Sequence, residues 1–275
     1  MNRDKTKFFI LNTESLWQET EKLENIQVTD QGISLEKSSI YSYDDTFVPG
    51  SVVPKSFDRD ACGVLYILDE IEKRIFVFDI MNRRSHWMFC TAFKEPVSIA
   101  VSDIDIFVVD MDMGTQILYC FARVNAQIRW EKEISENVRI AINPLGKESL
   151  YVLDTEKKKV FKANREWKLS EQEITLRDEE ENEYTLDKPT DIASDREGNF
   201  YLLEADERKV LKFSPVGRLM ETIAIPYKEE AQFLTLAVES SDKIFLGFRS
   251  TGLEVEEPGK NWGIVQLSRL TKYEI

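Results

Sequence analysis

The stretch "FDRDACGVLYILDEIEKRIFVFD", Phe57–Asp79, returns in altered form as "SDREGNFYLLEADERKVLKFS", Ser194–Ser214. Each copy holds a short apolar run that ends in a carboxylate, then a polar turn, then a second apolar run. The runs are rich in β-branched and aromatic residues and are bounded by Gly, Asp, Glu and Lys, which is typical of adjacent strands. Because the unit occurs at two distant places, the pattern indicates a repeat architecture.

The unit occurs five times, and the aromatic residue of its first strand recurs every 41 to 50 residues, at Tyr66, Phe107, Tyr151, Tyr201 and Phe245. A further apolar segment precedes most copies, as in "PVSIAV" from Pro96 and "PTDIAS" from Pro189. Each period therefore holds three recognisable strands and room for a fourth. Four-stranded units repeated radially predict an all-β fold, the β-propeller.

We expect one β-propeller domain over residues 1–275, with six blades as the prediction and five as the alternative. Residues 55–270 contain the five recognisable repeats, and residues 1–54 contain further strand candidates at Ile26–Glu36 and Ser38–Val48. These N-terminal strands are expected to complete a sixth blade with C-terminal strands. Such a blade would close the ring and remove exposed sheet edges.

The chain is acidic, with a formal net charge of −14 over 275 residues. Phosphate backbones and anionic lipid repel such a chain, so we expect no nucleic-acid partner and no membrane surface. No run approaches 18 apolar residues, and the run Phe8–Leu11 is too short for a signal peptide, so we expect no membrane insertion and a cytoplasmic location. Cys62, Cys90 and Cys120 form no CxxC motif and favour buried free thiols in a reducing compartment.

A carboxylate recurs at the end of the first repeat strand, at Asp69, Asp110, Asp154 and Glu204. A ring of carboxylates could hold a metal or do acid–base work. However, each one directly precedes a short turn, where Asp commonly accepts hydrogen bonds from the local backbone. We therefore interpret these four residues as structural.

Catalytic motifs are absent from the sequence, and we predict no catalytic residues, no metal site and no cofactor. His86 is the only histidine, which excludes two-histidine motifs such as HExxH, and no GxSxG, Walker A or GxGxxG occurs. The alternative is a metal-dependent, lactonase-like hydrolase with calcium in the channel. The inner strands would supply its ligands from Ser98, Arg139, Asp191 and Thr235, with Asp58 and Asn143 as additional candidates. One carboxylate among those four is a poor site for a hard divalent cation.

The longest period contains an acidic segment, "LRDEEENEYTLD", Leu176–Asp187. Loops on a rigid scaffold commonly carry binding function. We predict that this segment contributes a docking surface through Asp178, Glu179, Glu180, Glu181 and Glu183. Glycan or peptide capture at the channel mouth is a further alternative, helped by the tryptophans Trp87, Trp130, Trp167 and Trp262.

The segment "KPTDIASDREGNFYLLEADERKVLKF", Lys188–Phe213, resembles NHL-type propeller repeats, and the likeness extends over about 200 residues. This resemblance implies the fold and says little about function. More narrowly, "DACGVLYILD", Asp60–Asp69, resembles phage-tail-like propeller proteins associated with contractile injection systems. That resemblance implies a non-enzymatic structural or accessory component, near the baseplate or tail, whose partners are other protein components of the particle.

Overall fold

The computed structural model describes residues 54–79, 84–88, 93–134, 137–145, 149–164, 173–225, 231–240, 243–250 and 262–268, and the strands within 8–38. Every element assigned in these residues is a β-strand, which confirms the all-β prediction. No helix long and apolar enough to cross a membrane occurs in the described part of the chain.

Four sheets of four strands follow one another along the chain. The first contains β5 (Pro54–Arg59), β6 (Val64–Asp69), β7 (Ile75–Asp79) and β8 (Arg84–Trp87). The second contains β9 (Pro96–Val101), β10 (Asp105–Asp112), β11 (Thr115–Ala122) and β12 (Ile128–Ile134). The third contains β13 (Val138–Asn143), β14 (Ser149–Asp154), β15 (Lys159–Ala163) and β16 (Glu173–Ile174). The fourth contains β17 (Asp191–Ser194), β18 (Phe200–Glu204), β19 (Lys209–Phe213) and β20 (Leu219–Ala224).

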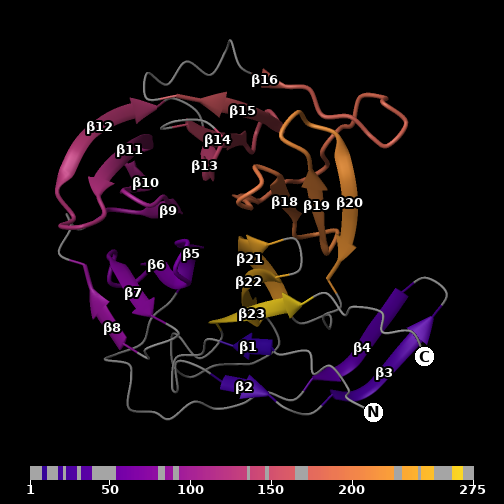
Figure 1. Ribbon diagram of the computed structural model, residues 1–275. Helices are drawn as coiled ribbons and strands as arrows, with labels where there is room; N and C mark the ends of the chain where they lie inside the picture. The colour runs from indigo at the N-terminus through magenta and orange to yellow at the C-terminus, as the bar shows by residue number, and fades with distance from the viewer. Residues whose placement is uncertain are drawn as a thin grey trace.

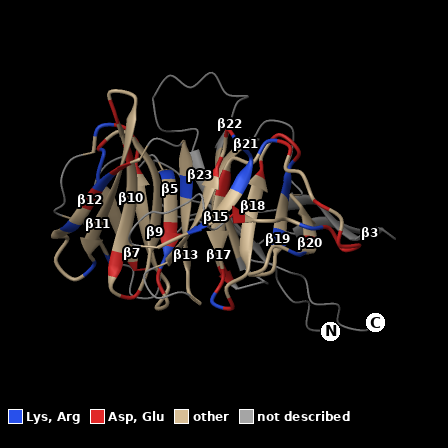
Figure 2. Ribbon diagram, turned by 90° about the horizontal axis from the view of Figure 1, so that it is seen from above, with Lys and Arg blue, Asp and Glu red and all other residues tan. Residues whose placement is uncertain are grey.

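A fifth sheet of three strands contains β21 (Ala231–Ser240), β22 (Lys243–Ser250) and β23 (Trp262–Ser268). The innermost strands β5, β9, β13, β17 and β21 lie beside one another in that order, and β21 lies beside β5. The five sheets therefore surround one axis (Figure 1), which is the arrangement of a propeller. Viewed edge-on, the strands run between two loop-bearing faces (Figure 2).

The predicted sixth blade is not confirmed, because the described residues form five radial sheets, the number given as the alternative. Near the N-terminus, β1 (Phe8–Ile10) pairs with β2 (Gln18–Thr20), and β3 (Leu23–Thr29) pairs with β4 (Gly32–Ser38). β1 lies beside β23, so N- and C-terminal strands are neighbours, but they belong to separate sheets and the predicted shared closing blade is not confirmed. The strand predicted from Ser38 to Val48 falls mostly outside the described residues.

The core lies between neighbouring blades. Each middle strand is a nearly continuous apolar run, such as "SLYVLD" in β14, because both of its faces are covered by adjacent sheets. One buried cluster joins the third and fourth blades and includes Tyr151, Phe200 and Phe213. The hydroxyl of the fully buried Tyr151 donates to the Gly198 carbonyl oxygen of the next blade, at 2.7 Å. Such contacts fix the relative position of the strand ends that form the channel.

Candidate functional site

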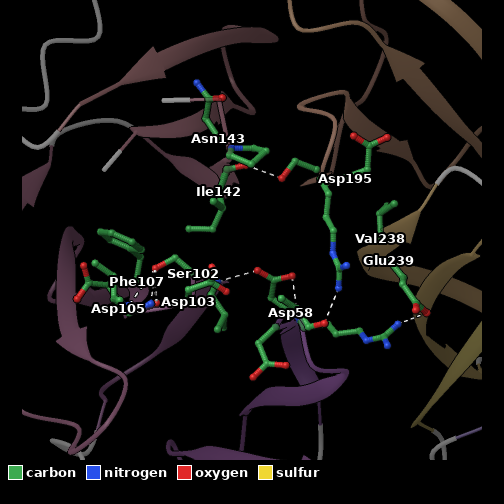
Figure 3. Close-up of a pocket in the computed structure, with 18 of the residues that line it drawn as sticks. Asp58, Ser102, Asp103, Asp105, Phe107, Ile142, Asn143, Asp195, Val238 and Glu239 are labelled. Atoms are coloured by element: carbon green, nitrogen blue, oxygen red, sulfur yellow. Dashed lines mark hydrogen bonds and ion pairs between the residues drawn. The ribbon is translucent and has the colours of Figure 1, made fainter. Parts of the chain in front are cut away.

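A cavity of about 530 Å³ opens where the C-terminal ends of the inner strands converge (Figure 3). All five inner strands contribute to its lining, with Asp58 from β5, Val101 from β9, Ile142 from β13, Ser194 from β17 and Val238 from β21. We call it the mouth cavity, and we call the side of the ring on which it opens the mouth face. Its volume lies in the range of small-ligand sites.

Carboxylates dominate the charge of the mouth cavity. Six of them line it, Asp58, Asp60, Asp103, Asp105, Asp195 and Glu239, against two arginines, Arg59 and Arg196. Three of the six are ion-paired, in the pairs Arg59–Glu239, Arg123–Asp60 and Arg129–Asp105. The cavity therefore keeps an excess of negative charge.

Asp58 departs from the repeat at the channel wall. In each blade one inner-strand residue lies directly opposite the recurring aromatic residue of the next strand. In four blades it is an alanine, namely Ala100, Ala141, Ala193 and Ala237. In the first blade it is Asp58, opposite Tyr66. The scaffold thus does not require a carboxylate at this position.

The Asp58 carboxylate is held by backbone amides. Its Oδ1 accepts a hydrogen bond from the Arg59 amide, and its Oδ2 accepts one from the Val101 amide of the next blade, each at 2.7 Å. Burial raises the pKa of Asp58 to about 7, the two amides oppose that rise, and the charges of Asp191 and Asp60 add to it. A carboxyl group with such a pKa changes its charge near neutral pH.

A second ring of polar residues lies deeper in the channel. Each lies two residues before the position that holds alanine in four blades and Asp58 in the first. They are Ser56, Ser98, Arg139, Asp191 and Thr235. Three of them accept a hydrogen bond from an amide of the next blade, in the pairs Ser56–Ile99, Ser98–Ile140 and Asp191–Leu236. This ring therefore ties neighbouring blades together.

The ligands suggested for a lactonase-like metal site are divided between the two layers. Ser98, Arg139, Asp191 and Thr235 lie in the deeper ring, whereas Asp58 and Asn143 line the mouth cavity. Within the described ranges, no group of three or more His, Cys, Asp or Glu residues is placed to hold a metal ion. A smaller cavity of about 210 Å³ opens at the other end of the channel and contains Lys55, Glu70, Arg139 and Asp191. Its charges are balanced, so the acidic mouth cavity is the more distinctive site.

Turns at the mouth face supply two of the cavity carboxylates. Asp60 Oδ1 accepts from the amides of Cys62 and Val64, at 2.9 and 3.0 Å, and Asp195 makes the equivalent turn in the fourth blade. Gly63 completes the first turn with a φ of 88°, a conformation that favours glycine. Cys62 is exposed at the tip of this turn, so the predicted burial is wrong for it, because a turn tip has no covering sheet. Cys120 is buried as predicted, and Cys90 lies outside the described residues.

The recurring carboxylates Asp69, Asp110, Asp154 and Glu204 lie on the opposite face and are almost fully buried. Asp69 accepts from the amides of Ile71 and Glu72, and Asp154 from those of Glu156 and Lys157. Asp110 and Glu204 differ, because their partners lie in the segment that leads into the inner strand of the same blade. Asp110 accepts from the amides of Lys94 and Glu95, and Glu204 accepts from the amide of Asp187. All four therefore accept hydrogen bonds from backbone amides, but in these contacts only Asp69 and Asp154 bind the turn that directly follows them.

Replacing Asp154 tests this structural interpretation. Asp154→Ala removes the acceptor for two turn amides, at 3.1 and 2.8 Å, and the partner of Lys157. We expect a loss of about 1–2 kcal/mol in the free energy of unfolding, measured by urea denaturation. Asp154→Asn keeps an acceptor oxygen and should lose less than the alanine variant. Equal stability of both variants and the wild type would contradict the interpretation.

The acidic segment lies at the outer rim between β16 and β20, away from the mouth cavity (Figure 1). Asp178 accepts from the amides of Glu180 and Asn182, at 2.9 and 2.8 Å, which folds the segment into a tight turn. The Arg218 side chain pairs with that of Glu181 at 3.3 Å. The backbones of Arg177 and Glu183 form an isolated antiparallel β-bridge. Of the predicted binding residues, all five lie at this rim, and none lines the cavity.

The remaining candidates are scattered. The Trp130 ring lies 6.0 Å from that of Phe107 and packs against the core of its blade. His86 is an exposed residue of β8. The side chains of Trp87, Trp167 and Trp262 lie outside the described residues.

No protein-family description matches this sequence, and no curated protein matches it. Solved structures share its fold at low identity. Glutaminyl cyclase of Myxococcus xanthus aligns with a TM-score of 0.54 at 12% identity, over 79% of this chain and 91% of that one. The nidogen/laminin complex aligns with a TM-score of 0.53 at 11% identity, over 90% of this chain and 89% of that one. A gluconolactonase of Xanthomonas campestris aligns with a TM-score of 0.51 at 12% identity, over 94% of this chain and 86% of that one.

Likenesses at this identity show the fold alone. They support the propeller part of the NHL-type resemblance and lend no support to the narrower resemblance to phage-tail-like proteins. Two of the three named structures are enzymes, so the comparisons do not support the prediction of a non-enzymatic protein either. The chain is therefore a β-propeller protein with an acidic cavity at one mouth of its channel.

Proposed function

We propose that this chain is a protein–protein interaction module that docks a basic partner on its mouth face. The observation that carries the proposal is the mouth cavity, where six carboxylates face two arginines at the convergence of all five blades. Complementary charge steers a basic partner to such a surface and suppresses acidic ones.

Apolar side chains at the tips of the surrounding loops supply contact area for a protein partner. Val124 is 93% exposed, Val216 77%, Leu145 64% and Ile104 58%. All four lie in turns on the mouth face, since each follows the first or the third strand of its blade. Apolar loop tips around a charged cavity are suited to contact with a protein partner, because burial of their side chains in the interface stabilises the complex.

For the partner itself, we propose a protein component of a contractile, phage-tail-like particle that assembles in the bacterial cytoplasm. Support for this narrower statement comes from the sequence resemblance of Asp60–Asp69 alone. In the structure this segment forms the β5–β6 turn and strand β6, and its first residue, Asp60, lines the mouth cavity. The acidic segment at Asp178–Glu183 would be a second, peripheral contact.

Affinity capture from the native host with charge-introducing variants tests the docking face. We expect the tagged wild type to retain one basic partner that Ile104→Glu and Leu145→Glu each lose, with at least tenfold less recovered by quantitative mass spectrometry. Met113→Glu is the matched control, because Met113 is fully exposed in the β10–β11 turn on the opposite face. Loss of the partner in the Met113→Glu control alone, or equal recovery of the partner by the wild type and all three variants, would contradict docking on the mouth face.

A further inference from the structure

We infer that Asp58 is the acceptor for a cationic side chain of the partner, a Lys ammonium or an Arg guanidinium that enters the mouth cavity. The inference rests on the proposed function and makes it more specific. It identifies one residue as the determinant of ligand class and one chemical group as the ligand.

The repeat itself singles out Asp58. Four blades carry alanine at the equivalent position, opposite the recurring aromatic residue, and they form their sheets in the same register. A carboxylate is therefore unnecessary for blade geometry. Burying a charged group without an opposite charge is unfavourable, and the two amide hydrogen bonds of Asp58 offset that cost only in part. Its presence in one blade therefore points to a role beyond blade geometry.

The hydrogen bonds of Asp58 leave room for a ligand. A carboxylate offers about four acceptor sites, and Asp58 uses one on each oxygen, toward the amides of Arg59 and Val101. Among the described residues no Lys or Arg side chain forms an ion pair with it. The adjacent Arg59 is instead paired with Glu239. Since Asp58 lines the mouth cavity, its remaining acceptor sites are accessible to a ligand from that side.

Nearby charges also favour a cation. Asp60, Asp103 and Asp195 line the same cavity, and Asp191 lies deeper in the channel close enough to affect Asp58. The other arginine that lines the cavity, Arg196, donates a hydrogen bond from its Nη2 to the Ala61 carbonyl oxygen at 2.5 Å. An anion entering the cavity would meet several carboxylates, whereas a cation would meet acceptors on several sides. Charge-assisted hydrogen bonds of this kind are roughly twice as strong as neutral ones.

A pair of capped tripeptides tests the inference. The probe is acetyl-Gly-Lys-Gly-amide, and its counterpart carries norleucine, which has a similar chain without the ammonium group. Binding is followed by NMR titration of the full chain at about 0.15 M ionic strength, where long-range attraction to the acidic protein is screened. We expect the lysine peptide to bind and the norleucine peptide to bind at least tenfold more weakly.

Two variants that each replace one Asp by Asn distinguish the effect of Asp58 on binding from the effect of losing one negative charge anywhere on the protein. Asp58→Asn should weaken binding of the lysine peptide at least tenfold. Asp206→Asn should leave it unchanged, because Asp206 lies in the β18–β19 turn on the opposite face and its side chain is exposed. Asp58→Ala introduces the residue type of the other four blades and provides a second test of the same loss.

Equal affinity in Asp58→Asn and wild type would overturn the inference, as would equal binding of the two peptides or no binding of the lysine peptide. The proposed function fails differently. If Ile104→Glu and Leu145→Glu lose the native partner while Asp58→Asn retains it, the docking face stands and the role of Asp58 is overturned. If none of the three variants affects the partner, the docking face itself is wrong.

Discussion

Raising the pH from 5 to 8 is expected to destabilise this protein, and Asp58→Ala is expected to remove most of that dependence. Burial raises the pKa of Asp58 from 3.8 to about 7 in the folded state. The folded state therefore binds more protons than the unfolded state between these two values, and stability falls as the pH rises through that window. From pH 5 to pH 8 we expect a loss of about 2.5 kcal/mol from this group.

Urea denaturation at pH 5, 6, 7 and 8 measures this effect. Asp191 contributes in the same direction, because burial raises its pKa to about 6, so Asp58→Ala should retain a smaller slope confined to the acidic end. Asp206→Ala is the control, since it removes a carboxylate with an exposed side chain on the opposite face. Parallel stability curves for the wild type and Asp58→Ala would show that Asp58 is not buried in the manner described.

Phe213→Ala is expected to lower the free energy of unfolding by about 3–5 kcal/mol, the usual cost of truncating a buried phenylalanine. Phe213 is fully buried in the cluster that joins the third and fourth blades. Its ring stacks on that of Phe200 with centroids 5.4 Å apart and meets the edge of Tyr184 at 5.7 Å. The cavity left by the substitution would be enclosed by two sheets that cannot easily move together.

Chemical denaturation of the same variant at one pH measures the loss. Val216→Ala, three residues further on and 77% exposed, is the matched control and should change stability by less than about 0.5 kcal/mol. A loss below about 1 kcal/mol for Phe213→Ala would contradict the packing between these two blades.

The blade could be predicted from the sequence because its signal is local. Tyr66, Tyr151 and Tyr201 recur at one position of the repeat, and in the structure each occupies the equivalent register of its sheet. The number of blades could not be predicted in the same way. It depends on whether the inner strands already meet, and β21 lies beside β5 without an intervening sheet. Strand patterns in residues 1–54 carry no information on that contact.

The mouth cavity was beyond local reasoning because its residues come from distant turns. Asp60 and Glu239 become neighbours of one cavity only because the first and last blades are adjacent in the ring. The acidic segment Asp178–Glu183 was the more conspicuous signal, but composition does not reveal whether a loop lies at the rim or at the axis. One signal was available, namely Asp58 in a column of alanines, and comparison of the five inner strands would have found it.

Binding at the mouth face is tested by a map of backbone amide chemical-shift changes on titration with acetyl-Gly-Lys-Gly-amide. Docking at the mouth face predicts the largest chemical-shift changes at the ends of the inner strands, for the amides of Arg59, Val101 and Ile142. These three residues line the cavity. Changes concentrated in Asp178–Glu183, or no saturable change at the strand ends, would contradict binding at the acidic channel mouth.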